Sequence, residues 1–296
     1  MTRRTLRGSL WLYVPMGLLA IFFLFPIVFM LVSSLKADDQ IFADLTSGGL
    51  AAFLPTSPVT LDNYAEVFRK VPVGRFLVNS LIVSLITVAF GLVVNSMAGF
   101  ALSRMRFRGQ TLVLGLIVAT LIVPFDSIAI PLLFEVAKLP GVRFEGLVPT
   151  FGTSWLDTYY VQIIPFIANA FSIFLFRQFF LAIPRELDEA AKVDGAGWFT
   201  IYRRIAAPLA GPAFATVAIL TFLPAWNQYL WPLLITTDRN LTPIVVGVTQ
   251  MISRSGDAAT AWNLVMATVV LAMIPPAVIV VLMQRWFVKG LIETEK

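Results

Sequence analysis

Apolar residues run along this chain in long stretches that contain no charged side chain. A helix needs about 20 apolar residues to cross a hydrocarbon core of about 30 Å. Six charge-free intervals approach or exceed that length: 8–35, 76–103, 109–125, 158–176, 205–237 and 258–284. The third interval is long enough only if the span continues past Asp126. We therefore predict six transmembrane helices, at about 9–35, 75–103, 110–134, 157–181, 206–236 and 260–286.

The remaining segments are predicted to connect the spans. The segment 36–74 contains prolines and a Gly48-Gly49 pair, and a short amphipathic helix is expected within it near Leu61–Phe68. We interpret this segment as an ordered extracellular or periplasmic cap. The interval 240–253 is charge-free but short, and it carries Pro243 and Gly247, so it predicts a loop or a surface helix.

Lysine and arginine set the orientation of the predicted spans, because they are enriched in cytoplasmic loops. Fourteen of the 22 basic residues fall on the side that holds both termini, and eight fall on the other. Six of the 17 acidic residues lie on the first side and eleven on the second. Both termini are therefore predicted to be cytoplasmic. The first apolar stretch is too long for the 7–15-residue core of a signal peptide, so we expect it to remain as a span.

The amino-acid composition narrows the class of protein to which this chain can belong. The chain of 296 residues is 58% hydrophobic and only 13% charged, with a mean hydropathy of +0.84. These values exclude a disordered chain, a nucleic-acid-binding domain and an ordinary soluble enzyme, and they predict an all-α integral membrane protein. Histidine and cysteine are both absent, which removes the commonest general base and the thiolate metal ligand. We expect no catalytic residue, metal or cofactor.

The most informative segment is the predicted cytoplasmic loop 183–207. Pro184 suits a first helical turn, and the acids that follow it complement the positive end of a helix dipole. Gly195 stands where a glycine in the left-handed conformation ends a helix. A second helix is predicted beyond it, since four apolar or aromatic residues recur at helical spacing, namely Trp198, Ile201, Tyr202 and Ile205. The loop is either an amphipathic connector on the bilayer or a helix that docks on a cytoplasmic partner.

The motif Glu189-Ala190-Ala191, followed by Asp194-Gly195 and Pro208, resembles the EAA loop of permease subunits of binding-protein-dependent ABC importers. The family pattern ends in Ile-x-Leu-Pro, and this chain has Ala207 in place of the leucine. Other segments are similar to the carbohydrate-type class of the maltose permease: Leu61–Tyr64, Asn79–Leu81, Ala98–Gly109, Ile173–Phe180, Trp226–Leu233 and Phe287–Leu291. A segment of extra residues on the outer side, around 140–154, departs from that class.

The resemblance implies a MetI-like type I ABC importer permease fold and a multi-pass protein of the bacterial inner membrane. It implies four kinds of partner besides membrane lipid: a second homologous permease, a cytoplasmic ATPase dimer, a solute-binding protein and a sugar-like substrate. No nucleic acid is expected. The chain has no Walker A motif, so ATP hydrolysis is assigned to a partner.

The resemblance also implies roles for the loop residues. Glu189 anchors the ATPase, Ala190 and Ala191 permit close approach, and Gly195 permits the sharp turn. The segment around Trp198 and Phe199 seats the loop against the transmembrane core. Asp194 and Pro208 complete the predicted coupling site.

A substrate path is predicted in the fifth span. Trp226 and Tyr229 would share one face of a helix, and Asn227 and Trp231 an adjacent one. Aromatic faces suit sugar C–H groups and an amide suits hydroxyls, although interfacial anchoring and helix contacts explain the same residues. Asn79 is added to this path. It is also one of four intramembrane amides, with Asn95, Gln162 and Asn169, for which helix–helix hydrogen bonding is the more frequent role.

Three other functions stay open at this point. An importer of glycerol-phosphate or a related polyol phosphate would have the same loop. A secondary transporter usually places ionisable groups near the membrane midplane, and they are scarce here. A membrane enzyme would need side chains that this sequence lacks.

Overall fold

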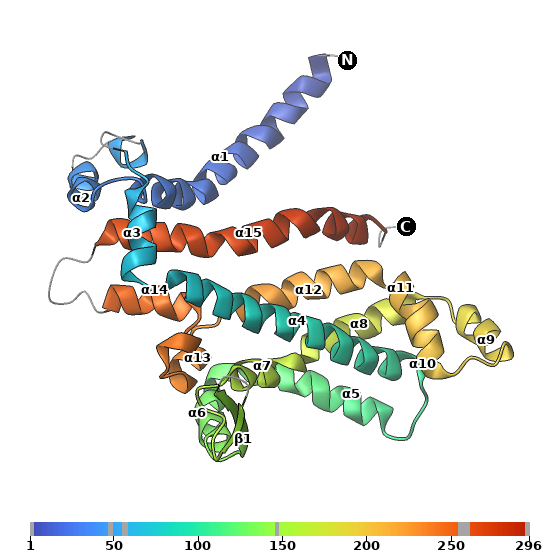
Figure 1. The fold of residues 1–296 in the computed structure, drawn as a ribbon. Helices are drawn as coiled ribbons and strands as arrows, with labels where there is room; N and C mark the ends of the chain where they lie inside the picture. Colours follow the sequence, from blue (N-terminus) through green and yellow to red (C-terminus); the bar gives the residue numbers. More distant parts are fainter. Residues whose placement is uncertain (1–2, 47–49, 55–58, 146–147, 254–260, 294–296) are drawn as a thin grey trace. The chain divides into compact units, whose positions relative to one another are not determined.

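The structure is a computed structural model, and it describes residues 3–46, 50–54, 59–145, 148–253 and 261–293. Within these ranges the regular secondary structure is helical except for one antiparallel hairpin (Figure 1). Three continuous helices are long and apolar enough to cross a membrane, at Trp11–Ser33, Val73–Arg104 and Trp262–Gln284. Three bent helix pairs bring the count to as many as six if each pair is one span. This count agrees with the six predicted spans. The first residue of the sixth predicted span, residue 260, lies outside the described part of the chain.

The chain forms two compact units, Met1–Gly74 with Gly247–Ile274, and Arg75–Val246 with Pro275–Lys296. The first unit contains α1 (Arg3–Ser33), α2 (Asp38–Thr46), η1 (Leu50–Phe53), α3 (Asp62–Lys70) and the beginning of α15 (Trp262–Glu293). The short helix α3 confirms the amphipathic helix expected near Leu61–Phe68.

Buried polar side chains hold the first unit together where α1 ends. Lys36 is 1% exposed, and its Nζ lies 2.7 Å from the Asp44 carboxylate and donates to the Ala51 carbonyl, also at 2.7 Å. The Asn63 amide donates to the carbonyls of Ser34 and Lys36 and accepts a hydrogen bond from Asn263. The predicted cap is therefore ordered by hydrogen bonds that satisfy backbone carbonyls beyond the end of a long apolar helix.

The second unit begins with most of α4 (Val73–Arg104), then α5 (Gln110–Ala119), η2 (Thr120–Ile122), α6 (Phe125–Val136), β1 (Gly141–Glu145) and β2 (Val148–Gly152). It continues through α7 (Tyr159–Ile167), α8 (Ala170–Ala182), α9 (Glu186–Val193), α10 (Trp198–Ile201), η3 (Tyr202–Ala206) and α11 (Ala207–Leu209). The elements α12 (Gly211–Trp226), α13 (Leu230–Ile235) and η4 (Arg239–Leu241) follow, and the second unit also takes the first residues of α14 (Ile244–Ser253), whose remainder belongs to the first unit. The segment 240–253, predicted as a loop or a surface helix, is therefore mostly helical.

Three of the predicted spans are bent, which the apolar pattern did not indicate. The axes of α5–η2 and α6 differ by 102°, those of α7 and α8 by 42°, and those of α10–α11 and α12 by 80°. Pro124 precedes α6 in an extended conformation and lacks the N–H that would continue the helix. Asp126 lies exposed in the first turn of α6, where its charge complements the helix dipole.

Asn95 closes the break between α7 and α8. Its Nδ2 donates to the Ile167 carbonyl at 2.9 Å, and its Oδ1 accepts from the Asn169 backbone N–H at 2.9 Å. Asn169 in turn caps α8 by accepting from the Ser172 backbone N–H. The break therefore loses few hydrogen bonds, because an amide on α4 replaces those that a continuous helix would make.

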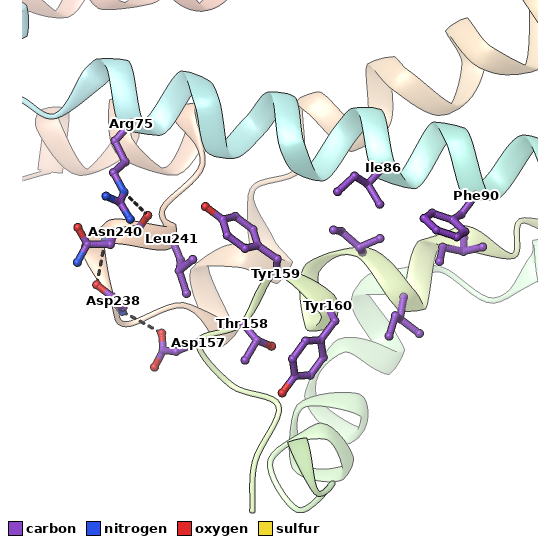
Figure 2. Close-up of a pocket in the computed structure, with 13 residues that line it drawn as sticks. Arg75, Ile86, Phe90, Asp157, Thr158, Tyr159, Tyr160, Asp238, Asn240 and Leu241 are labelled. Atoms are coloured by element: carbon purple, nitrogen blue, oxygen red, sulfur yellow. Dashed lines mark hydrogen bonds between the residues drawn. The ribbon is translucent and has the colours of Figure 1, made fainter. Parts of the chain in front are cut away.

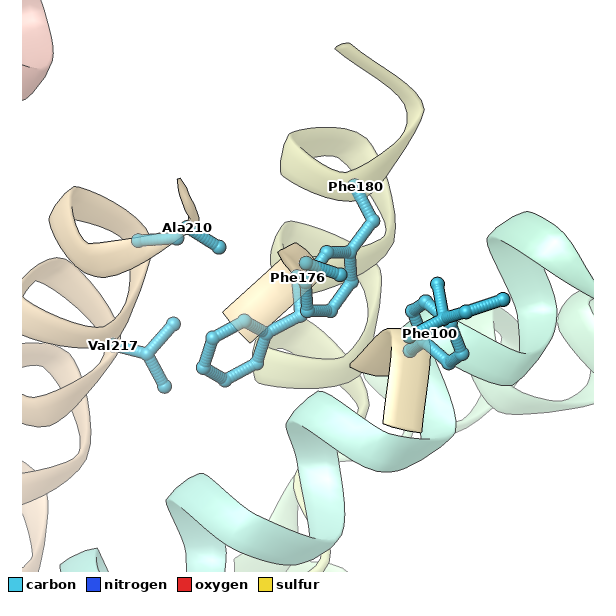
Figure 3. Packing of buried hydrophobic residues seen from close by; sticks show 8 residues of the cluster. Phe100, Phe176, Phe180, Ala210 and Val217 are labelled. Carbon is cyan, nitrogen blue, oxygen red and sulfur yellow. The ribbon is translucent and has the colours of Figure 1, made fainter. Parts of the chain in front are cut away.

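Two apolar clusters form the core of the second unit. One cluster joins α4, α8, α10 and α12 through Phe100, Phe176, Phe180, Ile201, Ala206, Ala210, Ala213 and Val217 (Figure 3). The other joins α6, α7 and α13 through Ala129, Val136, Val161, Trp231 and Ile235. In the first cluster Phe100 meets Phe180 edge-on at 5.6 Å, while Phe176 and Phe180 are stacked at 6.1 Å.

The segment around 140–154, predicted as an outer addition, contains the hairpin. β1 and β2 pair antiparallel with Gly141 opposite Gly152 and Glu145 opposite Val148. The side chains of Arg143, Phe144 and Glu145 lie outside the described part. Trp155, just after the hairpin, donates from its indole to the Pro140 carbonyl at 2.8 Å, which closes the base of this segment.

Close packing of α4 on α8 requires Gly99. A Cβ atom there would lie 2.7 Å from the Phe176 Cβ and 2.9 Å from the Arg177 backbone nitrogen. We predict that Gly99→Ala lowers the free energy of unfolding by about 1–3 kcal/mol, because the two backbones must separate. Gly115→Ala is the matched control, since nothing lies within 4 Å of a Cβ on that helical glycine. Thermal unfolding of both variants in detergent checks this, and equal midpoints would contradict it.

Candidate functional site

The predicted coupling loop forms a helix–turn–helix in the second unit. α9 begins at Glu186, and its first turn carries three acids, Glu186, Asp188 and Glu189. Glu189 and Ala190 are exposed, whereas Ala191 is half-buried against the phenylalanine cluster. The EAA triplet thus has one residue on the core side and two on the free side of the helix.

Gly195 ends α9 as the sequence predicted. Its φ is +82°, in the left-handed region that favours glycine. The Ala196 N–H donates to the Ala191 carbonyl, and the Gly195 N–H donates to the Lys192 carbonyl, both at 2.9 Å. These two bonds define a Schellman motif, which satisfies the carbonyls at the helix end and fixes the direction of the chain after it.

A buried ion pair attaches α9 to the end of α4. Arg104 Nε lies 3.3 Å from Asp188 Oδ2, and the two residues are 6% and 5% exposed. Arg104 Nη2 also donates to the Ile183 carbonyl, just after α8, at 2.6 Å. The pair joins three segments of the chain. Sequence reasoning assigned Asp188 only to the helix dipole and did not find its partner.

Trp198 seats the second helix of the loop. Its ring lies 6.2 Å from the Phe100 ring, edge-on, and the Lys192 ammonium lies 3.7 Å from its centroid. Phe199 differs from the expectation: it is 62% exposed and contacts the ring of Tyr202 rather than the cluster. The seating role predicted for both aromatic residues therefore fits Trp198 alone, because only one side of this short helix faces the core.

The chain returns from the loop to α12 through a π-helical turn, η3. Tyr202 opens this turn and its hydroxyl hydrogen-bonds the Ser96 hydroxyl on α4 at 2.7 Å. Pro208 follows in α11, before the chain bends at Ala210. Single π-helical turns are frequent at functional sites, and this one lies between the loop and the span that it joins.

A polar cleft of about 640 Å³ lies between α9 and the end of α4. Its walls come from the end of α4, the segment after it, and the loop: Arg104, Met105, Arg106, Phe107, Arg185, Asp188, Glu189, Lys192 and Trp198. The predicted anchor Glu189 therefore lies at the edge of a cleft that holds four basic residues.

The predicted substrate path is arranged differently from the expectation. α12 ends at Trp226, Asn227 is its C-cap residue, and α13 begins only at Leu230. Trp226 and Tyr229 therefore do not share the face of one helix, and neither do Asn227 and Trp231. Asn227 is exposed at the break, and Tyr229 is 40% exposed.

The two tryptophans of this path lie in the protein interior. Trp226 is 2% exposed and stacks on Phe222. Trp231 is 1% exposed and donates from its indole to the Val161 carbonyl at 2.9 Å. Their rings are engaged by the fold, so Asn227 and Tyr229 are the members of the set that remain accessible in this chain.

Asn79 is also engaged by the fold. Its Nδ2 donates to the carbonyls of Asn240 and Thr242, and its Oδ1 accepts from the Tyr159 hydroxyl at 2.6 Å. The residue is 1% exposed. Its geometry fits the other role considered for an intramembrane amide, hydrogen bonding within the protein, because it joins α4 to the segment before α14.

Sequence reasoning missed a cavity of about 910 Å³, whose lining includes Tyr159 and Asn240, two hydrogen-bond partners of Asn79 (Figure 2). Its polar lining comes from the start of α4, the start of α7 and the segment around η4: Arg75, Asp157, Thr158, Tyr159, Tyr160, Asp238 and Asn240. These residues are separated by up to 165 positions, so no local motif marks them. Arg75 alone gives a signal, as a charge at the beginning of an apolar span.

These features define a multi-span helical membrane protein with a rigid helix–turn–helix between its fourth and fifth predicted spans. Residues 88–293 match the family described as binding-protein-dependent transport system inner membrane component. The chain is 38% identical over 279 residues to an sn-glycerol-3-phosphate transport system permease protein of Brucella suis, with 92% of each chain covered. A protein of the same name from Yersinia pestis is 36% identical over 280 residues, with the same coverage.

The fold is found in a solved structure as well. A bacterial ABC transporter involved in the import of the acidic polysaccharide alginate superposes with a TM-score of 0.79, at 22% identity, covering 97% of this chain and 99% of that one. The chain therefore belongs to the family of inner membrane components of binding-protein-dependent transport systems. It is an ABC importer permease, which confirms the predicted family and excludes the secondary transporter.

The turn at Gly195 can be tested apart from transport. We predict that Gly195→Ala destabilises the loop by about 1–2 kcal/mol, because alanine is strained at this positive φ. Gly197→Ala is the matched control: its φ is −75°, and both glycines have open space where a Cβ would lie. Hydrogen exchange of the α9 amides measures the difference, and equal protection in the two variants would refute it.

Proposed function

We propose that this chain forms part of the membrane pore of an importer, and that a cytoplasmic ATPase drives it through α9. The observation that carries the proposal is the construction of this helix. Asp188, Ala191 and the Gly195 turn fix one side of it to the core, while the other side is free. A helix attached in this way moves as one body with the ends of α4 and α8.

The free side of α9 has the chemistry of a protein-binding surface. Leu187 is 42% exposed and Val193 88% exposed, and Glu189 and Ala190 lie on the same helix without burial. Phe199 adds an exposed aromatic ring beside the helix. Apolar groups next to exposed carboxylates, Glu189 among them, suit a groove on a partner that supplies a cation.

The other partners follow from the family and its relatives. We assign a second homologous permease to complete the pore and an extracytoplasmic binding protein to deliver the solute. One related solved structure is a bacterial alginate ABC transporter in complex with alginate pentasaccharide-bound periplasmic protein, at 15% identity and a TM-score of 0.61. The binding protein is the component that sets which solute arrives.

The solute is proposed to be a sugar, an oligosaccharide or a polyol phosphate. Asn227, in the break between α12 and α13, offers an amide at a place where the backbone is not helical, which suits a polar solute. The relatives named for sn-glycerol-3-phosphate support the polyol phosphate, and the sugar importer class fits the same family. Titration of the cognate binding protein with sn-glycerol-3-phosphate and with maltose separates the two classes.

Reversal of one charge tests the docking surface. Glu189→Lys is expected to lower co-purification of the ATPase at least tenfold, because the exposed carboxylate becomes a cation. Asp39→Lys, an exposed acid in α2 of the first unit, is the control and should leave co-purification unchanged. Membrane insertion is measured in both. Normal ATPase binding by Glu189→Lys would remove α9 as the coupling element.

Truncation of one amide tests the solute path. Asn227→Ala should reduce uptake by the reconstituted importer several-fold without changing its size-exclusion profile. Gln228→Ala, in the same break, controls for damage to the local backbone. If uptake is unchanged, or falls equally in both variants, Asn227 does not contact the solute.

A further inference from the structure

The cavity of about 910 Å³ in the second unit is polar at one end and apolar at the other. Figure 2 shows Arg75, Asp238 and Asn240 at one end, and Ile86 and Phe90 at the other. On α7 the lining changes in the same direction, from Thr158, Tyr159 and Tyr160 to Ile163, Ile164 and Ile167. A sugar or a small polyol phosphate would leave the apolar half unused, so this gradient suits an amphiphile.

The length of the cavity corresponds to one leaflet of a bilayer. Arg75 and Phe90 are 15 positions apart on α4, or about 22 Å at 1.5 Å per residue. Half of a bilayer, headgroups included, is also about 20–22 Å thick. The polar end belongs to the beginning of the span, at the predicted outer surface. The lining therefore changes from polar to apolar along the same axis and over the same distance as a phospholipid.

Arg75 uses only part of its guanidinium in hydrogen bonds within the protein. Its Nε donates to the Asn240 carbonyl at 3.0 Å, and Asn79 donates to the same oxygen at 2.8 Å. No carboxylate of the described residues lies within ion-pair distance of this guanidinium. The bond through Nε fixes one edge of the planar group and leaves both terminal nitrogens for a ligand. A phosphate is the anion that this geometry recognises by two parallel bonds.

The polar end also carries two carboxylates. Asp157 accepts from the backbone N–H groups of Thr237 and Asp238 and from the Thr237 hydroxyl, so it orders the segment before η4. Asp238 accepts from the Asn240 N–H and is exposed at the cavity. Because the exposed Asp238 carboxylate lies at the same end of the cavity as Arg75, this end suits a headgroup that carries both charges better than a purely anionic one.

We propose that this cavity is a binding site for a zwitterionic glycerophospholipid of the phosphatidylethanolamine type. The phosphate binds the terminal nitrogens of Arg75, and the ammonium group lies beside Asp238. One acyl chain covers Ile86, Phe90 and Ile164. The site adds a defined lipid to the importer.

Lipid titration of the complete importer, followed by native mass spectrometry, tests the site. Wild type should bind dioleoyl-phosphatidylethanolamine about tenfold more tightly than phosphatidylglycerol or phosphatidylcholine. The quaternary ammonium of phosphatidylcholine has no N–H to donate to Asp238. Arg75→Gln should weaken binding about tenfold, and Asp238→Asn should remove the preference over phosphatidylcholine. Phe90→Ala should weaken the binding of all three lipids several-fold.

Two variants serve as controls, and three outcomes would overturn the proposal. Arg69→Gln removes an exposed arginine of the first unit, and Phe134→Ala an exposed phenylalanine outside the cavity; neither should change lipid binding. The proposal fails if Arg75→Gln binds as wild type does. It also fails if soluble sn-glycerol-3-phosphate competes at the affinity of the lipid, which would make the cavity a solute site. Loss of importer assembly in Arg75→Gln, with unchanged lipid per assembled complex, would instead assign the cavity to a partner chain.

Discussion

Hydrogen bonds from side-chain amides to interrupted backbone are the constraint on which this structure depends. The hydrocarbon core of a bilayer offers no water to an open N–H or C=O, so every break in a spanning helix needs a partner from within the protein. Asn95 supplies both partners at the break between α7 and α8. Asn79 supplies two donors to the segment before α14, and Ser80 accepts from the Ile244 N–H that begins this helix. All three side chains lie on α4, which makes this helix the support of the second unit.

The same helix supports the cytoplasmic loop. Arg104, in its last turn, joins α9 through Asp188 and the end of α8 through the Ile183 carbonyl. Removing one partner of a buried ion pair leaves the other charge without compensation and costs about 3–5 kcal/mol. This link resists separation of the loop from the span. A force applied to the free side of α9 is therefore transmitted to α4 and α8. Without this link, α9 could bend by itself and the spans would not move.

The features that the sequence predicted are those set by local chemistry. Charge-free runs identified the spans, and a glycine after an acidic, alanine-containing segment identified the Schellman turn at Gly195. The breaks were missed because an interrupted span has the same apolar composition as a continuous one. The helix faces expected to be shared by Trp226 and Tyr229, and by Asn227 and Trp231, were wrong for this reason: the prediction assumed one helix, whereas α12 ends at Trp226. Pairings such as Arg104 with Asp188 join residues 84 positions apart, and no periodicity reveals them.

The breaks in the spanning helices allow a change of angle, whereas the link between α9 and α4 holds two elements together. Each break lies between two helical segments, so a change of angle there can leave the hydrogen bonds within each segment in place; at the α7–α8 break it disturbs the bonds made by Asn95. The 80° bend at Ala210 lies next to the π-helical turn and the Tyr202–Ser96 hydrogen bond, directly between α9 and α12. A movement of the loop reaches α12 through this bend, and the far end of α12 is the break that holds Asn227. The elements that connect the proposed ATPase surface on α9 to the proposed solute path at Asn227 are thus consecutive in the chain: α10, η3, α11 and α12.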